Sequence, residues 1–153
     1  MTEDALISLL SVATSAACQQ MTPQHLKVLY DSAEYAFSLP ARPQWGSKAA
    51  AHAEMFTLLA DVADHPVTAA GPGGAVHFMR QLIITVGPAA DGMITSSRRR
   101  LLAHLGAGRA DEAALEMEKH LRGLHYMWRL TGPRGADASR AHGRQPAPSF
   151  SPC

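Results

Sequence analysis

Apolar residues recur at intervals of three and four along most of this chain, and short stretches containing Pro or Gly interrupt the pattern. The interval matches the 3.6-residue turn of an α-helix, so each stretch predicts one helix with a single apolar face. The predicted helices cover residues 3–20, 22–37, 45–64, 76–86, 91–105 and 111–130. Short connections place neighbouring helices antiparallel, so we expect an all-α, antiparallel bundle of six to seven helices.

Capping and breaking residues set the boundaries of the second helix. Thr22 and Pro23 suit its start, because a hydroxyl accepts hydrogen bonds from the first N–H groups and proline fits the first turn. Pro40 and Pro43 end the same helix and form a short linker. Residues 82–86 contain a short apolar run, which lies inside a helical pattern and does not predict a strand.

The composition separates one folded domain from a C-terminal tail. Of the 153 residues, 46% are hydrophobic and 18% are charged, which is enough apolar material for a core. The residues after Thr131 are rich in Gly, Pro, Ser and Arg instead. We therefore expect a helical domain over residues 1–130 and a disordered tail over residues 131–153.

The charge balance and the amino terminus limit which binding partners and which cellular location we expect. A formal net charge of +1 gives no electrostatic case for nucleic acid or a membrane as the main partner. No window reaches the roughly 18 uninterrupted apolar residues of a membrane span, and the first residues carry acids where a secretory signal carries bases. Cys18 and Cys153 form no disulfide framework, so we expect a cytoplasmic protein.

Eight histidines raise the question of a metal site, and their spacing argues against one built on a single helix. A helix presents two imidazoles to one ion when they lie four residues apart, and no pair here has that spacing. His120 and His125 lie five residues apart, so their side chains diverge by roughly 140° around the axis. We expect these histidines to lie on the surface or to be hydrogen-bonded in the core.

Arg98, Arg99 and Arg100 form the one basic run of the chain. Three consecutive helical residues fan over about 200°, so they cannot all follow one phosphate track. The pattern instead predicts two solvated arginines and one that points inward. A buried guanidinium must find a carboxylate, a phosphate or a bound anionic ligand.

Motifs for catalysis are missing from the sequence. The Gly-rich stretch at residues 71–74 lacks the Lys-Ser/Thr and the preceding strand of a phosphate-binding loop, so it predicts a plain connector. Ser, His and acidic residues form no nucleophile motif, so we expect that this chain is not an enzyme. The alternative is that His52 or His120 acts as a general acid or base in an enclosed pocket.

Three segments, taken in order, resemble the FCD domain, the effector-binding half of one branch of the GntR family of bacterial transcription regulators. Its opening, where one helix ends at a Thr-Pro-like start of the next, is similar to residues 10–29, LSVATSAACQQMTPQHLKVL. Its Asp-x-x-Phe-His helix is similar to residues 51–67, AHAEMFTLLADVADHPV. Its His-Arg-x-Leu-Leu helix pair is similar to residues 98–121, RRRLLAHLGAGRADEAALEMEKHL. The resemblance covers roughly residues 5–130 and implies six or seven helices around a ligand cavity.

The resemblance also implies a ligand site. Many family members hold a divalent metal through one Asp and three His, and small carboxylates bind there. The matching positions of this chain are His52, Phe56, Arg98 and His120. Two imidazoles, a benzyl ring and a guanidinium do not hold a hard cation, so we expect these four residues to bind ligand with neither metal nor cofactor.

Arg98 would replace the metal as the positive centre for an anionic effector, because a guanidinium binds a carboxylate through a two-pronged fork. The other interpretation is that Arg98 points to solvent or pairs with Glu116 or Glu118. Met1 opens almost directly onto the first helix, so the winged helix-turn-helix of full-length family members is not expected in this chain. Binding to an operator by this chain alone is not expected either.

The resemblance therefore predicts the ligand-sensing domain of a GntR-type regulator, which binds a small organic acid and forms a homodimer. The ligand would favour one helix arrangement, and in an intact regulator this change would move the DNA-binding domains. The alternative is a stand-alone interaction module that forms heterodimers with full-length regulators.

Overall fold

The computed structural model of the chain describes residues 2–64 and 74–131. Within these residues the chain forms an all-α bundle, as the sequence predicts. The helices are α1 (Glu3–Gln20), α2 (Pro23–Ser38), α3 (Trp45–Ala63), α4 (Ala75–Val86), the short 3₁₀-helix η1 (Pro88–Ala90), α5 (Asp91–Gly106) and α6 (Ala110–Thr131). The predicted disordered tail lies outside the described residues, apart from Thr131, which ends α6. The predicted connector lies outside them as well, apart from Gly74.

Capping groups explain where the first two helices begin. The Thr2 hydroxyl accepts a hydrogen bond from the backbone N–H of Ala5 at 3.1 Å. At α2, the Thr22 hydroxyl accepts from the N–H of His25, and the ring of His25 accepts from the N–H of Thr22. This reciprocal pair satisfies two groups that an uncapped helix leaves free, so Thr22 and Pro23 start α2 as predicted.

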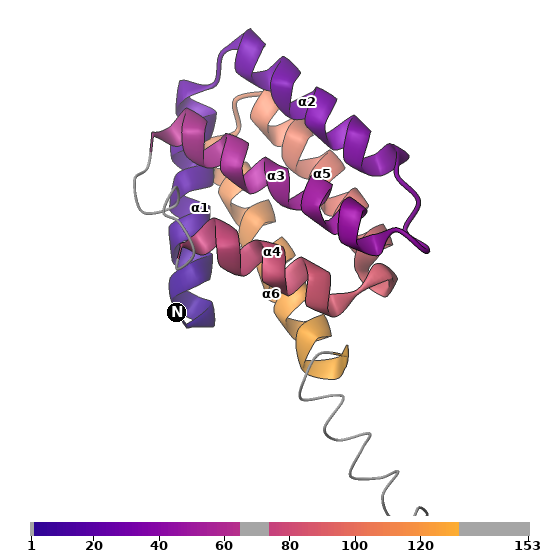
Figure 1. Cartoon of the computed structure of the whole chain (residues 1–153). Coiled ribbons are helices and arrows are strands. Elements are labelled where there is room, and N and C mark those ends of the chain that lie inside the picture. The colour runs from indigo at the N-terminus through magenta and orange to yellow at the C-terminus, as the bar shows by residue number, and fades with distance from the viewer. Residues whose placement is uncertain (1, 65–73, 132–153) are drawn as a thin grey trace, which may run out of the picture.

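The helices pack in two groups around α3 and α6. Helix α3 contacts α1, α2 and α4, whereas α6 contacts α1, α4 and α5, and α2 also touches α5. Figure 1 shows α2 lying beside α3 at one edge of the bundle, with α5 behind them. Arg129, near the end of α6, donates to Glu3 at 2.9 Å, so α1 and α6 run antiparallel.

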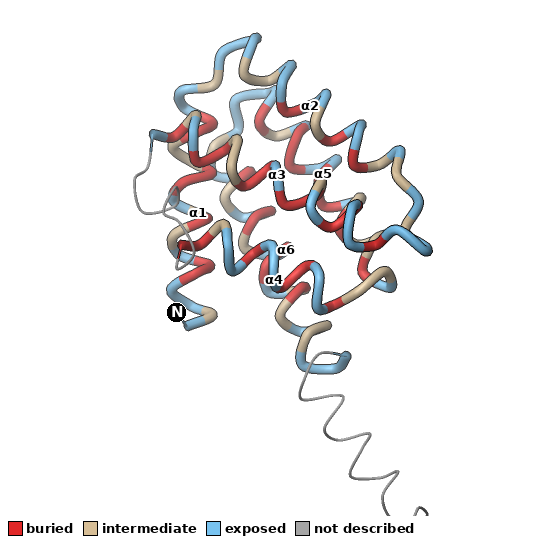
Figure 2. Tube along the Cα trace, in the orientation of Figure 1, coloured by how far each residue is buried: buried red, intermediate tan, exposed pale blue. Residues whose placement is uncertain are grey.

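The core occupies the inner faces of these helices, where the buried stretches in Figure 2 face one another. Large apolar side chains fill its centre, among them Leu29, Ile83, Ile94, Met117 and Leu124. The polar and charged residues buried with them are Thr14, Lys48, His52, Ser97, Arg98, Glu116 and His120. Several of these lie close together, and they position the candidate site. None of the described helices is long and apolar enough to cross a bilayer.

Candidate functional site

The four residues predicted to bind ligand form one buried group, which we call the Arg98 cluster: His52, Phe56, Arg98 and His120. Helix α3 supplies His52 and Phe56, α5 supplies Arg98 and α6 supplies His120. Each is at most 3% exposed. The Arg98 guanidinium carbon lies 4.7 Å from the centre of the Phe56 ring. The ring of His120 is stacked on Phe56 with centres 6.3 Å apart, so Phe56 contacts both polar side chains.

One arginine of the basic run points inward, as predicted, and it is Arg98. Arg98 is 2% exposed as a whole residue, whereas the side chains of Arg99 and Arg100 are 60% and 58% exposed. Glu116 pairs with Arg100 and Glu118 pairs with Arg122, so neither acid pairs with Arg98. The alternative that Arg98 faces solvent or joins one of these carboxylates is therefore not the arrangement in this structure.

The Arg98 guanidinium is buried with few partners. Nη1 donates to the backbone carbonyl of His52 at 2.8 Å. Nε and Nη2 have no hydrogen-bond partner among the described residues, and no described carboxylate forms an ion pair with Arg98. Burial lowers the pKa of Arg98 to about 9, so the group remains charged at neutral pH. A buried, uncompensated positive charge is costly, and the contact with Phe56 offsets only part of that cost.

The two histidines of the cluster are neutral. Burial, and then the charge of Arg98, lower the pKa of His52 to about 4, although Asp91 acts in the opposite direction. Burial first, and then electrostatic interactions with Arg98, His52 and Arg100, lower the pKa of His120 well below its usual value. Neither ring nitrogen of His120 has a partner among the described residues. A neutral imidazole carries one N–H and one lone pair, so His120 can donate one hydrogen bond to a ligand.

Asp91, at the start of α5, holds His52 in place. Its Oδ1 lies 3.0 Å from Nε2 of His52, and its Oδ2 lies 3.4 Å from Nζ of Lys48. Because a carboxylate accepts, this contact assigns the His52 proton to Nε2 and leaves Nδ1 as a buried acceptor. The Lys48 ammonium in turn donates to the carbonyls of Phe37 and Leu39 at the end of α2. Asp91 and Lys48 thus connect the cluster to α2.

The enclosed space beside the cluster is small. A cavity of about 10 Å³ touches His52 and Arg98 on the side that faces α2. That volume is about what one water molecule requires. Its lining is Ser32, Ala33, Ala36, Phe37, Ala51, His52, Met55 and Arg98. An organic acid does not fit there unless side chains or helices move.

A larger hollow opens on the face formed by α5 and α6, and we call it the vestibule. It has a volume of about 440 Å³ and is lined by Met93, Ser97, Arg100, His104, Glu116, Lys119 and His120. His120 belongs to both sites, because it lines the vestibule and also stacks on Phe56. His120 is therefore the member of the Arg98 cluster that forms part of the vestibule wall, and its ring has no hydrogen bond within the described residues.

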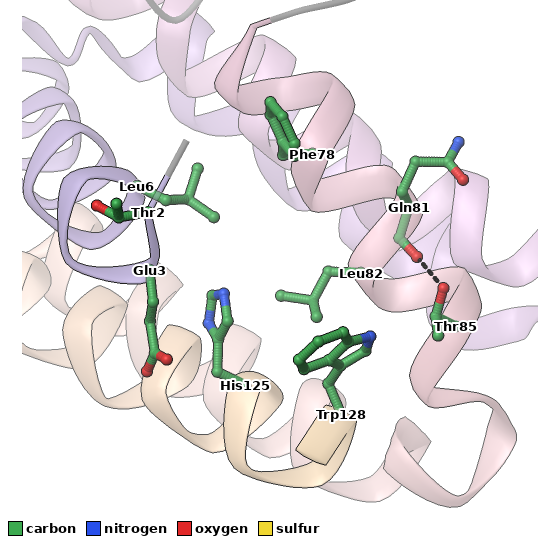
Figure 3. A pocket seen from close by; sticks show the side chains of 9 residues that line it. All are labelled: Thr2, Glu3, Leu6, Phe78, Gln81, Leu82, Thr85, His125 and Trp128. Atoms are coloured by element: carbon green, nitrogen blue, oxygen red, sulfur yellow. Dashed lines mark hydrogen bonds between the residues drawn. The ribbon is translucent and has the colours of Figure 1, made fainter. Parts of the chain in front are cut away.

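Another hollow, of about 320 Å³, lies between the start of α1, α4 and α6. Figure 3 shows Leu6, Phe78, Leu82 and Trp128 around it, so its walls are mainly apolar. Its one acid, Glu3, already pairs with Arg129. None of the buried polar atoms that lack a partner within residues 2–64 and 74–131 lies on this hollow. The Arg98 cluster and the vestibule are therefore the better candidate site.

Several residues of this site could not be recognised from the sequence, namely Lys48, Asp91, Ser97, Arg100 and Lys119. Asp91 is visible in the sequence only as an acid at a helix start, and its pairing with His52 spans 39 residues. In the part of the chain that the structure describes, no three His, Cys, Asp or Glu residues are grouped so that they could hold a metal ion.

No family model, no curated protein and no solved structure matches this chain.

Proposed function

We propose that this chain is a ligand-sensing domain that binds a small organic acid through Arg98, without a metal. The observation that carries the proposal is the buried guanidinium, of which Nε and Nη2 have no partner among the described residues. A buried charge of this kind is stable when an opposite charge pairs with it. The structure provides no carboxylate for that purpose within the described residues, so a bound anion is the group that would complete the site.

The donors of the cluster suit a carboxylate. The Nε and Nη2 atoms of Arg98 form one edge of a planar fork, and two parallel hydrogen bonds from such an edge match the two oxygens of a carboxylate. His120 can add a third donor. Because His52 and His120 are neutral, Arg98 carries the single charge among the four residues of the Arg98 cluster. One carboxylate neutralises it.

The lack of open space makes ligand binding a conformational event. The cavity beside Arg98 holds about one water molecule, so a bound acid favours a helix arrangement that differs from the one described here. A ligand shifts such an equilibrium when it binds one arrangement better than the other. This behaviour fits the resemblance to the FCD domain, because in an intact GntR-type regulator the helix movement would be passed to the DNA-binding domains.

Exposed apolar side chains on two adjoining helices favour self-association. Val12 on α1 is 58% exposed, and Leu115 and Tyr126 on α6 are 48% and 58% exposed. Helices α1 and α6 pack against each other. We propose a homodimer through these helices, and the same surface would serve the alternative function, heterodimer formation with full-length regulators. Light scattering after size exclusion tests the first, and mixing with an intact regulator tests the second.

Thermal shift measurements with a panel of small organic acids test the proposed binding. At least one acid should raise the melting temperature of the wild-type protein, and the increase should be lost in Arg98→Met. The control is Arg99→Met, which removes an exposed arginine next in the chain and should keep the increase. A panel that raises the melting temperature equally in wild type and Arg98→Met would contradict binding through Arg98.

A further inference from the structure

One buried polar side chain on the wall of the vestibule indicates that a ligand binds there. His120 is 3% exposed, lines the vestibule and keeps both ring nitrogens without a hydrogen bond among the described residues. On its other side it stacks on Phe56, over which the Arg98 guanidinium lies. Ser97, which precedes Arg98 in the chain, also lines the vestibule. His120 therefore connects the vestibule with the Arg98 cluster through its contact with Phe56.

The charges on the wall of the vestibule leave an excess of positive charge. Glu116 is fully engaged, because Arg100 donates to it at 2.8 Å and the Ser97 hydroxyl donates to it at 3.0 Å. Arg100 and Glu116 therefore compensate each other. Lys119 has no ion pair with any described residue, and it lies on the same wall. Its ammonium is the free positive charge of this hollow.

We propose that the ligand is a dicarboxylate, which reaches the site between α5 and α6 by displacing the His120 ring, and which binds one carboxylate at Arg98 and the other in the vestibule at Lys119. This inference rests on the proposed function of the Arg98 cluster. The hollow is large enough for the outer part of a small acid, and binding pockets for small molecules have volumes that start near 300 Å³. The inner cavity alone is too small for the whole ligand.

The lowered pKa of His120 agrees with its position between the charges of Arg98 and Arg100. Apart from burial and His52, the groups that lower this pKa are Arg98 inside and Arg100 on the vestibule wall. A neutral ring costs less to move through a positively charged passage than an imidazolium. The His120 ring is uncharged, so it can move away from Phe56 without placing a second positive charge near Arg98.

Calorimetric titration with pairs of acids of equal length tests the proposal. The dicarboxylates are succinate, glutarate and adipate, and the monocarboxylates are butyrate, valerate and hexanoate. For at least one pair, the wild-type protein should bind the dicarboxylate about fivefold more tightly, the factor expected from one partly exposed ion pair. In Lys119→Gln the two acids of that pair should bind equally.

The matched control is Lys27→Gln, which makes the same chemical change on α2, where Lys27 pairs with Asp31 on the surface. This variant should keep the fivefold preference. If both acids of every pair bind equally to wild type and lose affinity only in Arg98→Met, the second carboxylate site is wrong and the proposed function stands. A preference that persists in Lys119→Gln overturns the inference in the same way. If none of the six acids binds, both proposals fail.

Discussion

Asp91 and His52 face each other across 39 residues of sequence, with Oδ1 of the carboxylate 3.0 Å from Nε2 of the ring. The same carboxylate lies 3.4 Å from the Lys48 ammonium. Asp91 therefore holds His52 in place, and the backbone carbonyl of His52 accepts the hydrogen bond from Arg98.

Replacing Asp91 by alanine should destabilise the fold. The Asp91→Ala change leaves the buried Nε2–H of His52 without its acceptor and removes the opposite charge beside Lys48, although Lys48 keeps its two carbonyl acceptors. We expect a loss of about 2 kcal/mol in the free energy of unfolding, measured by urea titration. Asp31→Ala, which breaks an exposed ion pair with Lys27, should change it far less, because water screens that pair. Equal effects of the two changes would contradict a role for Asp91 in holding His52.

Replacing Arg98 by methionine should leave the ligand-free protein as stable as wild type or more stable. An apolar side chain of similar length fills the same space and removes a buried charge that lacks a carboxylate, so the free energy of unfolding should rise by 0 to about 2 kcal/mol. Arg98→Ala should be less stable than Arg98→Met, because it leaves a cavity. Urea titration in low-salt buffer measures both. A loss of more than about 2 kcal/mol in Arg98→Met would show that the guanidinium stabilises the fold without an anion.

The helices could be predicted because their signals are local. The apolar spacing and the cap at Thr22 and Pro23 depend on residues within a turn or two of each other, and the structure places α2 from Pro23 as expected. It could also be predicted that one arginine of the run points inward, since three consecutive residues fan over about 200° of a helix. Which of the three points inward came from the resemblance.

The partners of the site residues could not be predicted. Helical spacing tells which face a residue occupies, and it does not tell which residue of another helix meets it. Asp91 therefore read as an acid at a helix start, and its contacts with His52 and Lys48 became visible only in the packed bundle. The vestibule and the small cavity likewise depend on how side chains from three or more helices fill space, which no local pattern specifies.

Removing metal ions should leave the protein unchanged. The charge at the centre of the candidate site belongs to Arg98, and a cation placed beside it in a buried site would be repelled by several kcal/mol. Dialysis against EDTA should therefore change neither the melting temperature nor the binding of an organic acid. Zn²⁺ or Ni²⁺ found at one equivalent in the purified protein, and lost together with stability on EDTA treatment, would overturn this view.

Acid should destabilise the protein through its buried histidines. The pKa of His52 is about 4 in the folded chain, against 6.5 for a free side chain, and that of His120 is lowered as well. Between these values the unfolded chain binds protons that the folded chain does not, so stability is complete above pH 6.5 and falls as the pH drops toward 4. The loss from His52 alone is at most about 3 kcal/mol.

Urea titration between pH 7 and pH 4.5 measures this loss, and a pair of variants separates it from the titration of carboxylates. His120→Phe keeps a ring against Phe56 and removes one of the buried titrating groups, so its free energy of unfolding should fall less steeply with decreasing pH than that of wild type. The matched control is His77→Gln, which removes an exposed histidine on α4 that lies outside the Arg98 cluster. A His120→Phe variant with the same slope as wild type would mean that His120 takes up protons as readily in the folded protein as in the unfolded chain, and the neutral ring on which the proposed entry of the ligand depends would then be wrong.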